Sequence, residues 1–144
     1  MTTSAVNGNH HKVRVLLADD SLVFLKTLQH FLQKCHELKI VGVAHNGREA
    51  LALAKAERPD IILLDLLMPE LSGLEIIPDL RASLPNSRVI VLSLLGYREI
   101  AAIVGADEFV FKPELATELV PAIQRVLQNH LACTDSHSKL NISQ

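Results

Sequence analysis

Three acidic residues and one lysine each stand directly after an apolar segment of this chain. They are Asp19 and Asp20 after residues 13–18, Asp65 after residues 61–64, and Lys112 after residues 109–111. Because the carboxyl ends of parallel strands meet at one edge of a sheet, these side chains should converge there if the segments are parallel strands. Carboxylate oxygens are the ligands that Mg²⁺ prefers, and an ammonium group attracts phosphoryl oxygens. The pattern therefore predicts a site for a divalent cation and a phosphoryl group.

The elements that must position this site alternate between strands and helices. Apolar runs predict strands over residues 13–18, 40–44, 60–64, 88–92 and 108–111. Helical spacing of apolar residues and capping signals predict helices over residues 21–34, 46–57, 73–84, 97–104 and 117–129. Thr117 is expected to cap the last helix, which would leave Pro121 close to the helix start, where proline is tolerated. Strands and helices in alternation indicate an α/β fold with a parallel sheet and right-handed crossovers.

Composition and charge exclude several classes of protein. The chain has 144 residues, and its polar segments 1–11 and 130–144 are expected to be flexible tails around one domain at 12–129. The net charge of −2 gives no basic surface for nucleic acid. No apolar run approaches the roughly 20 residues of a membrane span, and the first residues lack the apolar segment of a signal peptide. Cys35 and Cys133 fit no metal or redox spacing, so two reduced thiols in a cytoplasmic protein are expected.

Four motifs at the ends of predicted strands follow one another along the chain. They are Leu17-Ala18-Asp19-Asp20-Ser21, Asp65-Leu66-Leu67-Met68-Pro69 with Ser72-Gly73, Val91-Leu92-Ser93, and the run from Gly105 to Pro113. In this order they resemble the CheY-like receiver domain of bacterial response regulators, over about residues 12–129. The resemblance implies a flavodoxin-like, doubly wound five-stranded parallel sheet with five helices. It is nearest to receivers joined to helix-turn-helix DNA-binding domains, and no such domain follows here. A stand-alone receiver is therefore expected, with a receiver cut from a longer DNA-binding regulator as the alternative.

The resemblance implies how the predicted site works. Asp20 and Asp65 would bind Mg²⁺ directly, Asp19 would act mainly through a metal-bound water, and the backbone carbonyl of Leu67 would complete the protein ligands. Asp65 would be the phosphoacceptor that attacks the phosphohistidine of a sensor histidine kinase or phosphotransfer protein. Lys112 would stabilise the transferred phosphoryl group. Such a receiver catalyses only its own phosphorylation and dephosphorylation, so it is not expected to be an enzyme with a separate substrate.

The same resemblance implies a switch that carries the signal to a partner. The Ser93 hydroxyl would donate to a phosphoryl oxygen and move inward, while Lys112 is pulled the same way. Phe109 would then rotate from outside to inside, into the space that Ser93 vacates. The partner surface would be the face made by the fourth helix, the fifth strand and the fifth helix. The downstream partner is expected to be a protein, with no direct contact to nucleic acid or membrane.

Two features depart from the pattern of the family. Between Ser93 and Lys112 the chain is roughly three residues shorter than expected, close to one helical turn, in or before the fourth helix. The switching surface lies there, so the shortening bears on the output partner and on dimerisation through this face. Leu94 and Leu95 follow Ser93 where a small residue and then often a polar residue are usual. With Leu67 they are expected to form an apolar rim over Asp65.

These residues also have structural interpretations. Asp20 could cap the first helix, and Ser93 could be a turn residue that satisfies its own backbone. Lys112 could be a solvated charge, and Phe109 could be a core residue. A protein of another class could use the receiver fold as an interaction module that is independent of phosphorylation, although every residue needed for phosphorylation is present. A flavin-binding protein of the same topology would need a Ser-, Thr- or Gly-rich phosphate loop after the first strand, where this chain has Asp-Asp-Ser.

Overall fold

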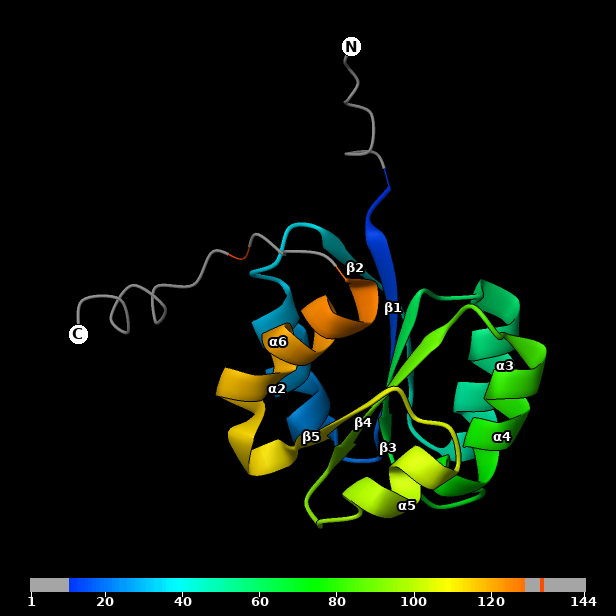
Figure 1. Ribbon diagram of the computed structural model, residues 1–144. Coiled ribbons are helices and arrows are strands. Elements are labelled where there is room, and N and C mark those ends of the chain that lie inside the picture. Colours follow the sequence, from blue (N-terminus) through cyan, green and yellow to red (C-terminus); the bar gives the residue numbers. More distant parts are fainter. Residues whose placement is uncertain (1–10, 129–132, 134–144) are drawn as a thin grey trace.

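The computed structural model describes residues 11–128 and residue 133, and within them one parallel sheet lies between two layers of helices (Figure 1). The strands are β1 (Val13–Ala18), β2 (Leu38–Ala44), β3 (Ile61–Asp65), β4 (Arg88–Ser93) and β5 (Glu108–Phe111). The helices are α2 (Leu22–Leu32), α3 (Gly47–Glu57), α4 (Gly73–Ser83), α5 (Arg98–Ile103) and α6 (Leu115–Leu127). The 3₁₀ turn η2 (Lys112–Glu114) joins β5 to α6. The predicted alternation is confirmed, with small differences at the ends of elements.

The order of the strands decides which side chains meet at the edge of the sheet. The order is β2-β1-β3-β4-β5, and every neighbouring pair is parallel. This is the flavodoxin-like order, so the predicted doubly wound sheet is confirmed. In the register of β1 and β3, Ala18 lies opposite Leu64. Asp19 and Asp65, each one residue further along, therefore lie at the ends of neighbouring strands.

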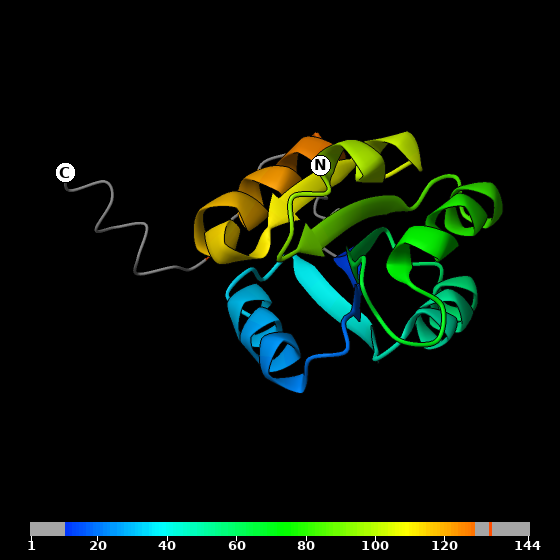
Figure 2. The same ribbon diagram turned by 90° about the horizontal axis from the view of Figure 1, so that it is seen from below.

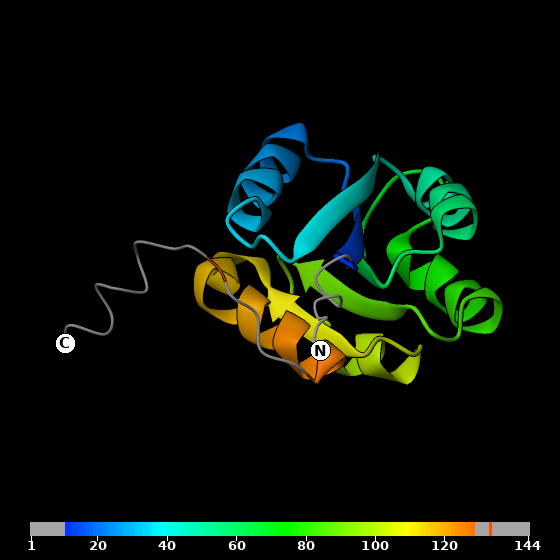
Figure 3. The same ribbon diagram turned by 90° about the horizontal axis from the view of Figure 1, so that it is seen from above.

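The two faces of the sheet carry different helices (Figures 2 and 3). On one face α2 and α6 pack together, with Leu28 and Leu119 in the same buried apolar cluster. On the other face α3, α4 and α5 contribute Ala54, Ile77 and Ala101 to a second cluster. β3 is the central strand, and all of its residues are buried. A strand covered on both faces is a continuous apolar run, which is why a buried carboxylate at its end stands out in the sequence.

The start of the last helix differs from the prediction. Three other helices begin at side-chain N-caps, which are Ser21, Asn46 and Ser72. α6 instead begins at Leu115, directly after η2, and the Thr117 hydroxyl donates to the Glu114 carbonyl oxygen at 3.2 Å. Thr117 is therefore not a cap, and Pro121 lies well inside the helix rather than near its start. The sequence pattern misplaces this start because η2 leads from β5 into α6 without a side-chain cap.

The two cysteines are joined in a disulfide with an S–S distance of 2.10 Å, so the prediction of two reduced thiols is wrong. Cys35 lies buried in the turn that follows α2, and Cys133 lies beyond the end of α6. α2 and α6 pack on the same face of the sheet, and the bond joins positions 98 residues apart in the sequence. Sequence spacing carries no information on such a contact, because the contact depends on how the two helices pack.

The ends of the chain lie largely beyond the described part. The predicted tails, residues 1–11 and 130–144, fall outside the described residues except for His11 and Cys133. α6 ends at Leu127, and Gln128 is its C-cap with a φ of 53° in the left-handed region. Within residues 11–128, none of the helices has the length and apolar character needed to cross a membrane.

Candidate functional site

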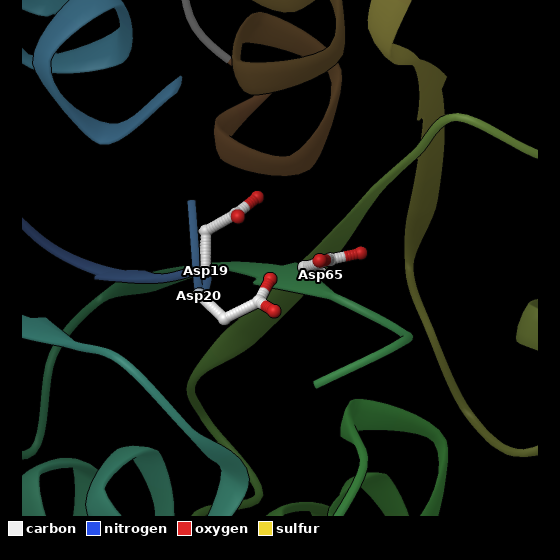
Figure 4. A group of neighbouring side chains, drawn as sticks. All are labelled: Asp19, Asp20 and Asp65. Atoms are coloured by element: carbon white, nitrogen blue, oxygen red, sulfur yellow. The ribbon is translucent and has the colours of Figure 1, made fainter. Parts of the chain in front are cut away.

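The carboxylates of Asp19, Asp20 and Asp65 meet at the carboxyl edge of the sheet, as the sequence predicts (Figure 4). Each contributes an oxygen atom, and these atoms lie within 4.8 Å of one another. Asp19 and Asp65 are buried, whereas Asp20 is exposed. Three carboxylates this close repel one another unless a cation lies among them. The oxygen donors fit Mg²⁺, and these three residues would hold the ion, which would supply positive charge beside Asp65.

The loop behind Asp65 depends on a close backbone approach at Gly73. A Cβ at this position would lie 2.1 Å from the Asp65 carbonyl oxygen, so only glycine fits there. The Gly73 N–H donates to the Leu66 carbonyl oxygen at 2.9 Å, and Ser72 caps α4 through a capping box with Glu75. The Ser72-Gly73 motif therefore fixes how the chain leaves β3 and holds the end of that strand in place.

Lys112 is not a solvated charge, because only 9% of its side chain is exposed. Its ammonium donates to Asp19 Oδ2 at 2.6 Å and lies 3.6 Å from Asp65 Oδ2. The ring of Phe24 has its centroid 4.2 Å from the same nitrogen. The sequence motifs locate Lys112 but not Phe24, since Phe24 lies on α2 and meets the lysine, which follows β5, only in the folded chain.

Asp19 and Asp20 take different roles. Asp19 Oδ1 accepts from the Ser21 N–H at 2.8 Å, while Oδ2 accepts from Lys112. Both oxygens of Asp19 therefore already accept hydrogen bonds, and its water-mediated contact to the metal stays a prediction. Ser21 is the N-cap of α2, because its Oγ accepts from the Phe24 N–H at 3.1 Å. The interpretation of Asp20 as that cap is therefore wrong, and its carboxylate points toward the site (Figure 4).

Burial raises the pKa of Asp65 from 3.8 to about 6. Repulsion by Asp19 adds to this rise, attraction by Lys112 and the hydrogen bond from the Leu67 N–H oppose it, and Asp20 adds a smaller rise. Near neutral pH the carboxyl is still ionised, so it is available as a nucleophile. Because the folded-state pKa lies above the ordinary value, the charge destabilises the metal-free fold above about pH 6. This cost disappears as the pH falls through 6 toward 3.8.

We expect Asp20→Ala to stabilise the metal-free fold slightly while it weakens Mg²⁺ binding. The gain should be below the roughly 1.4 kcal/mol that one pKa unit represents, because Asp20 is the smallest cause of the raised pKa of Asp65. It should be present at pH 8 and absent at pH 4, where Asp65 is largely protonated. Urea unfolding in chelator measures the stability, and calorimetric titration measures the Mg²⁺ affinity. A less stable variant at pH 8 would contradict the repulsion argument.

Ser93 and three leucines complete a pocket of about 200 Å³ around Asp65 and Lys112. Ser93 is buried, and its Oγ accepts from the Leu95 N–H at 3.1 Å. The interpretation of Ser93 as a turn residue is thus correct, since its hydroxyl oxygen accepts a hydrogen bond from the backbone of its own turn. The hydroxyl proton can still be donated into the pocket. Leu67, Leu94 and Leu95 line the same pocket and are exposed, so the predicted apolar rim is present. The structure does not test the predicted metal contact of the Leu67 carbonyl.

Phe109 lies inside the molecule, at the edge of the α3–α4–α5 face. Its side chain belongs to the buried cluster of that face, in agreement with the core interpretation. The guanidinium carbon of Arg98 lies 4.9 Å from the centroid of the Phe109 ring. Arg98 is the first residue of α5, which spans only six residues. The predicted rotation of Phe109 from outside to inside is not tested, and its predicted starting position differs from this structure, where the side chain is already buried and contacts Arg98.

Comparison with known proteins agrees with this geometry. The family model of the response regulator receiver domain matches residues 15–124. An uncharacterised transcriptional regulatory protein of Bacillus subtilis, YxjL, is 33% identical over 119 residues, which are 81% of this chain and 55% of that protein. The signal receiver domain of NarL from Mycobacterium tuberculosis is 33% identical with a TM-score of 0.76, covering 82% of this chain and 98% of that one. A chain of the CheX–CheY–BeF₃–Mg²⁺ complex from Borrelia burgdorferi is 28% identical with a TM-score of 0.74, covering 79% of this chain and 88% of that one.

Two facts show which part of these proteins the chain resembles. The segment that the family model matches contains every residue of the acidic cluster, together with Ser93 and Lys112. The chain spans about half the length of YxjL but nearly all of the NarL receiver domain, so the similarity is to a receiver and not to a whole regulator. This chain belongs to the response-regulator receiver family.

Proposed function

We propose that this receiver accepts a phosphoryl group on Asp65 from a sensor histidine kinase or phosphotransfer protein, with Mg²⁺ as its cofactor. The observation that carries the proposal is the position of Lys112, whose ammonium lies 3.6 Å from the buried Asp65 carboxylate inside a cluster of acidic residues. One similar structure holds Mg²⁺ together with BeF₃, which has the shape and charge of a phosphoryl group. In this chain Asp20 and Asp65 would bind the ion and place its charge beside the incoming phosphoryl group.

The proposed transfer uses the ionised carboxyl of Asp65 as the nucleophile. One carboxylate oxygen attacks the phosphorus of the phosphohistidine, a P–O bond forms as the P–N bond breaks, and the electron pair stays on the imidazole nitrogen. Negative charge on the transferred oxygens is then met by the Lys112 ammonium and the Ser93 hydroxyl. Both groups already line the pocket around Asp65, so the transfer requires only small movements of side chains.

A phosphotransfer screen tests the proposal. Purified sensor histidine kinases, first autophosphorylated with labelled ATP, are mixed with this chain in Mg²⁺ and in chelator. We expect rapid transfer of one label per chain from at least one kinase, and none in chelator. If neither any kinase nor acetyl phosphate labels the chain, the phosphorylation-independent interaction module becomes the better description of the protein.

Phosphorylation is proposed to change the surface made by α5, β5 and α6. Ser93 ends β4 and Lys112 follows β5, so a pull on both toward the phosphoryl group acts directly on this surface. Phe109 and its contact with Arg98 lie on the same side of the sheet as α5. A downstream protein partner would bind this surface, and neither nucleic acid nor membrane is part of the proposal. α5 is only six residues long, so the partner contacts a short helix there.

We expect the phosphorylated state to be long-lived, because hydrolysis needs a water that polar side chains orient in line with the phosphorus. Leu67 and Leu95 line the pocket and offer no hydrogen bond from their side chains. Replacing Leu67 with Asn and Leu95 with Glu should accelerate the loss of label several-fold after the kinase is removed. Ile103→Asn is the matched control, since it also makes an exposed apolar residue polar but lies outside the pocket. An unchanged decay rate in the double variant would show that the rim does not set the lifetime.

The proposed cellular setting follows from the same chemistry. We propose that the receiver acts in the cytoplasm, because its kinase would use ATP there. The chemistry is the same in a single-domain receiver and in one domain of a longer regulator, and the mass of the gene product in cells distinguishes the two.

A further inference from the structure

Phe24 contacts the ammonium group of Lys112, and the roles proposed above for the site residues do not explain this contact. We propose that Phe24 is a positioning residue for phosphorylation, which holds the Lys112 ammonium beside Asp65 instead of in solvent. The inference rests on the proposed function, because it concerns how Lys112 is presented to the transferred phosphoryl group.

The contact is of the cation–π kind. The Lys112 nitrogen lies 4.2 Å from the centroid of the Phe24 ring, well within the roughly 6 Å over which an aromatic face attracts an ammonium group. The same nitrogen is 2.6 Å from Asp19 Oδ2 and 3.6 Å from Asp65 Oδ2. A lysine side chain has a long flexible stem, so its ammonium needs neighbours on several sides to stay in one place.

The backbone of Phe24, which carries the ring, is held by the capping hydrogen bond at the start of α2. Asp19 accepts from the Ser21 N–H at 2.8 Å, and Ser21 Oγ accepts from the Phe24 N–H at 3.1 Å. Two hydrogen bonds through Ser21 therefore connect Asp19, which binds Lys112, to the backbone of Phe24, whose ring packs on the same lysine. Leu22 and Val23, the other residues of this turn, are exposed, whereas Phe24 packs against the α2–α6 core cluster.

A neutral aromatic face suits this task better than another carboxylate. When Asp65 carries a phosphoryl group, the ammonium has to shift from Asp19 toward a phosphoryl oxygen. A carboxylate in place of the ring would compete with the phosphoryl group for the charge and for hydrogen bonds. The ring attracts the ammonium without accepting a strong hydrogen bond, so it limits the movement of Lys112 but leaves its N–H groups free to donate.

Substitution of Phe24 separates this role from packing. Phe24→Leu keeps an apolar side chain but removes the aromatic face, and Phe24→Tyr keeps the face. Phe31→Leu is the matched control, because Phe31 lies on the same helix and packs partly buried against the same cluster. We expect phosphorylation by acetyl phosphate in Mg²⁺ to be roughly threefold to thirtyfold slower in Phe24→Leu. Rates in Phe24→Tyr and Phe31→Leu should stay close to that of the wild type, and melting temperatures confirm that all variants fold.

A double-mutant cycle with Lys112→Ala shows whether Phe24 acts through the lysine. Phe24→Leu should slow the wild type but leave the already slow Lys112→Ala protein unchanged. The NMR signals of the Lys112 Hε protons give an independent readout, since the ring current of Phe24 should shift them upfield in the wild type but not in Phe24→Leu. Equal rates for wild type and Phe24→Leu, or equal effects in both backgrounds, overturn the inference and leave the proposed function standing. Absence of label on the wild type overturns the proposed function and the inference together.

Discussion

Asp65→Asn should reduce incorporation of a phosphoryl group to background. Asparagine has nearly the same shape, but its amide oxygen carries no full negative charge and cannot form the acyl phosphate. Asp65 is also the carboxylate of this cluster that ends the central buried strand and faces Lys112. The measurement is label per chain after mixing with a phosphorylated kinase, read by gel and by intact mass.

Two comparisons make this result specific. Asp79→Asn changes an exposed aspartate that pairs with Lys55 at 3.6 Å on the surface, so it should take label like the wild type. Asp65→Asn should also be more stable than the wild type in chelator at pH 8, because it removes a carboxylate whose pKa is raised to about 6. A stable Asp65→Asn protein that still takes full label would remove Asp65 as the acceptor and leave Asp19 or Asp20 to be examined.

Loss of the disulfide should lower the free energy of unfolding by about 2–4 kcal/mol. The bond closes a long loop, since Cys35 and Cys133 are 98 residues apart, and it therefore restricts the unfolded chain strongly. It also ties the segment beyond α6 to the turn after α2, on the face where these two helices share a core cluster. The measurement is urea unfolding of Cys133→Ser against the wild type, followed by circular dichroism.

Cys133 is the better position for this substitution, because Cys35 is buried and a serine hydroxyl there would add a cost of its own. Reductant should lower the stability of the wild type to that of Cys133→Ser and should leave the variant unchanged. Wild-type protein that titrates two free thiols and ignores the reductant would show that the bond does not form in solution.

Much of the fold and of the site could be predicted from the sequence. β3 is covered on both faces, so its residues form an unbroken apolar run, and the polar residue at its end is conspicuous. Asn46 with Glu49 shows the start of α3 in the sequence, because an N-cap acts over a few neighbouring residues. The start of α6 could not be predicted in this way, since the η2 turn leads into it without a capping side chain.

The sequence by itself determined which residues form the acidic cluster of the candidate site. Asp19 and Asp20 follow β1, and Asp65 ends β3. The alternation of strands with helices makes those strands parallel, which brings their ends to one edge. Only the tertiary structure decided how these groups are partnered. Lys112 binds Asp19 more closely than Asp65 and packs on Phe24, and Cys35 bonds to Cys133. Such contacts depend on how α2 and α6 pack over the sheet, and that packing cannot be predicted from local periodicity and spacing.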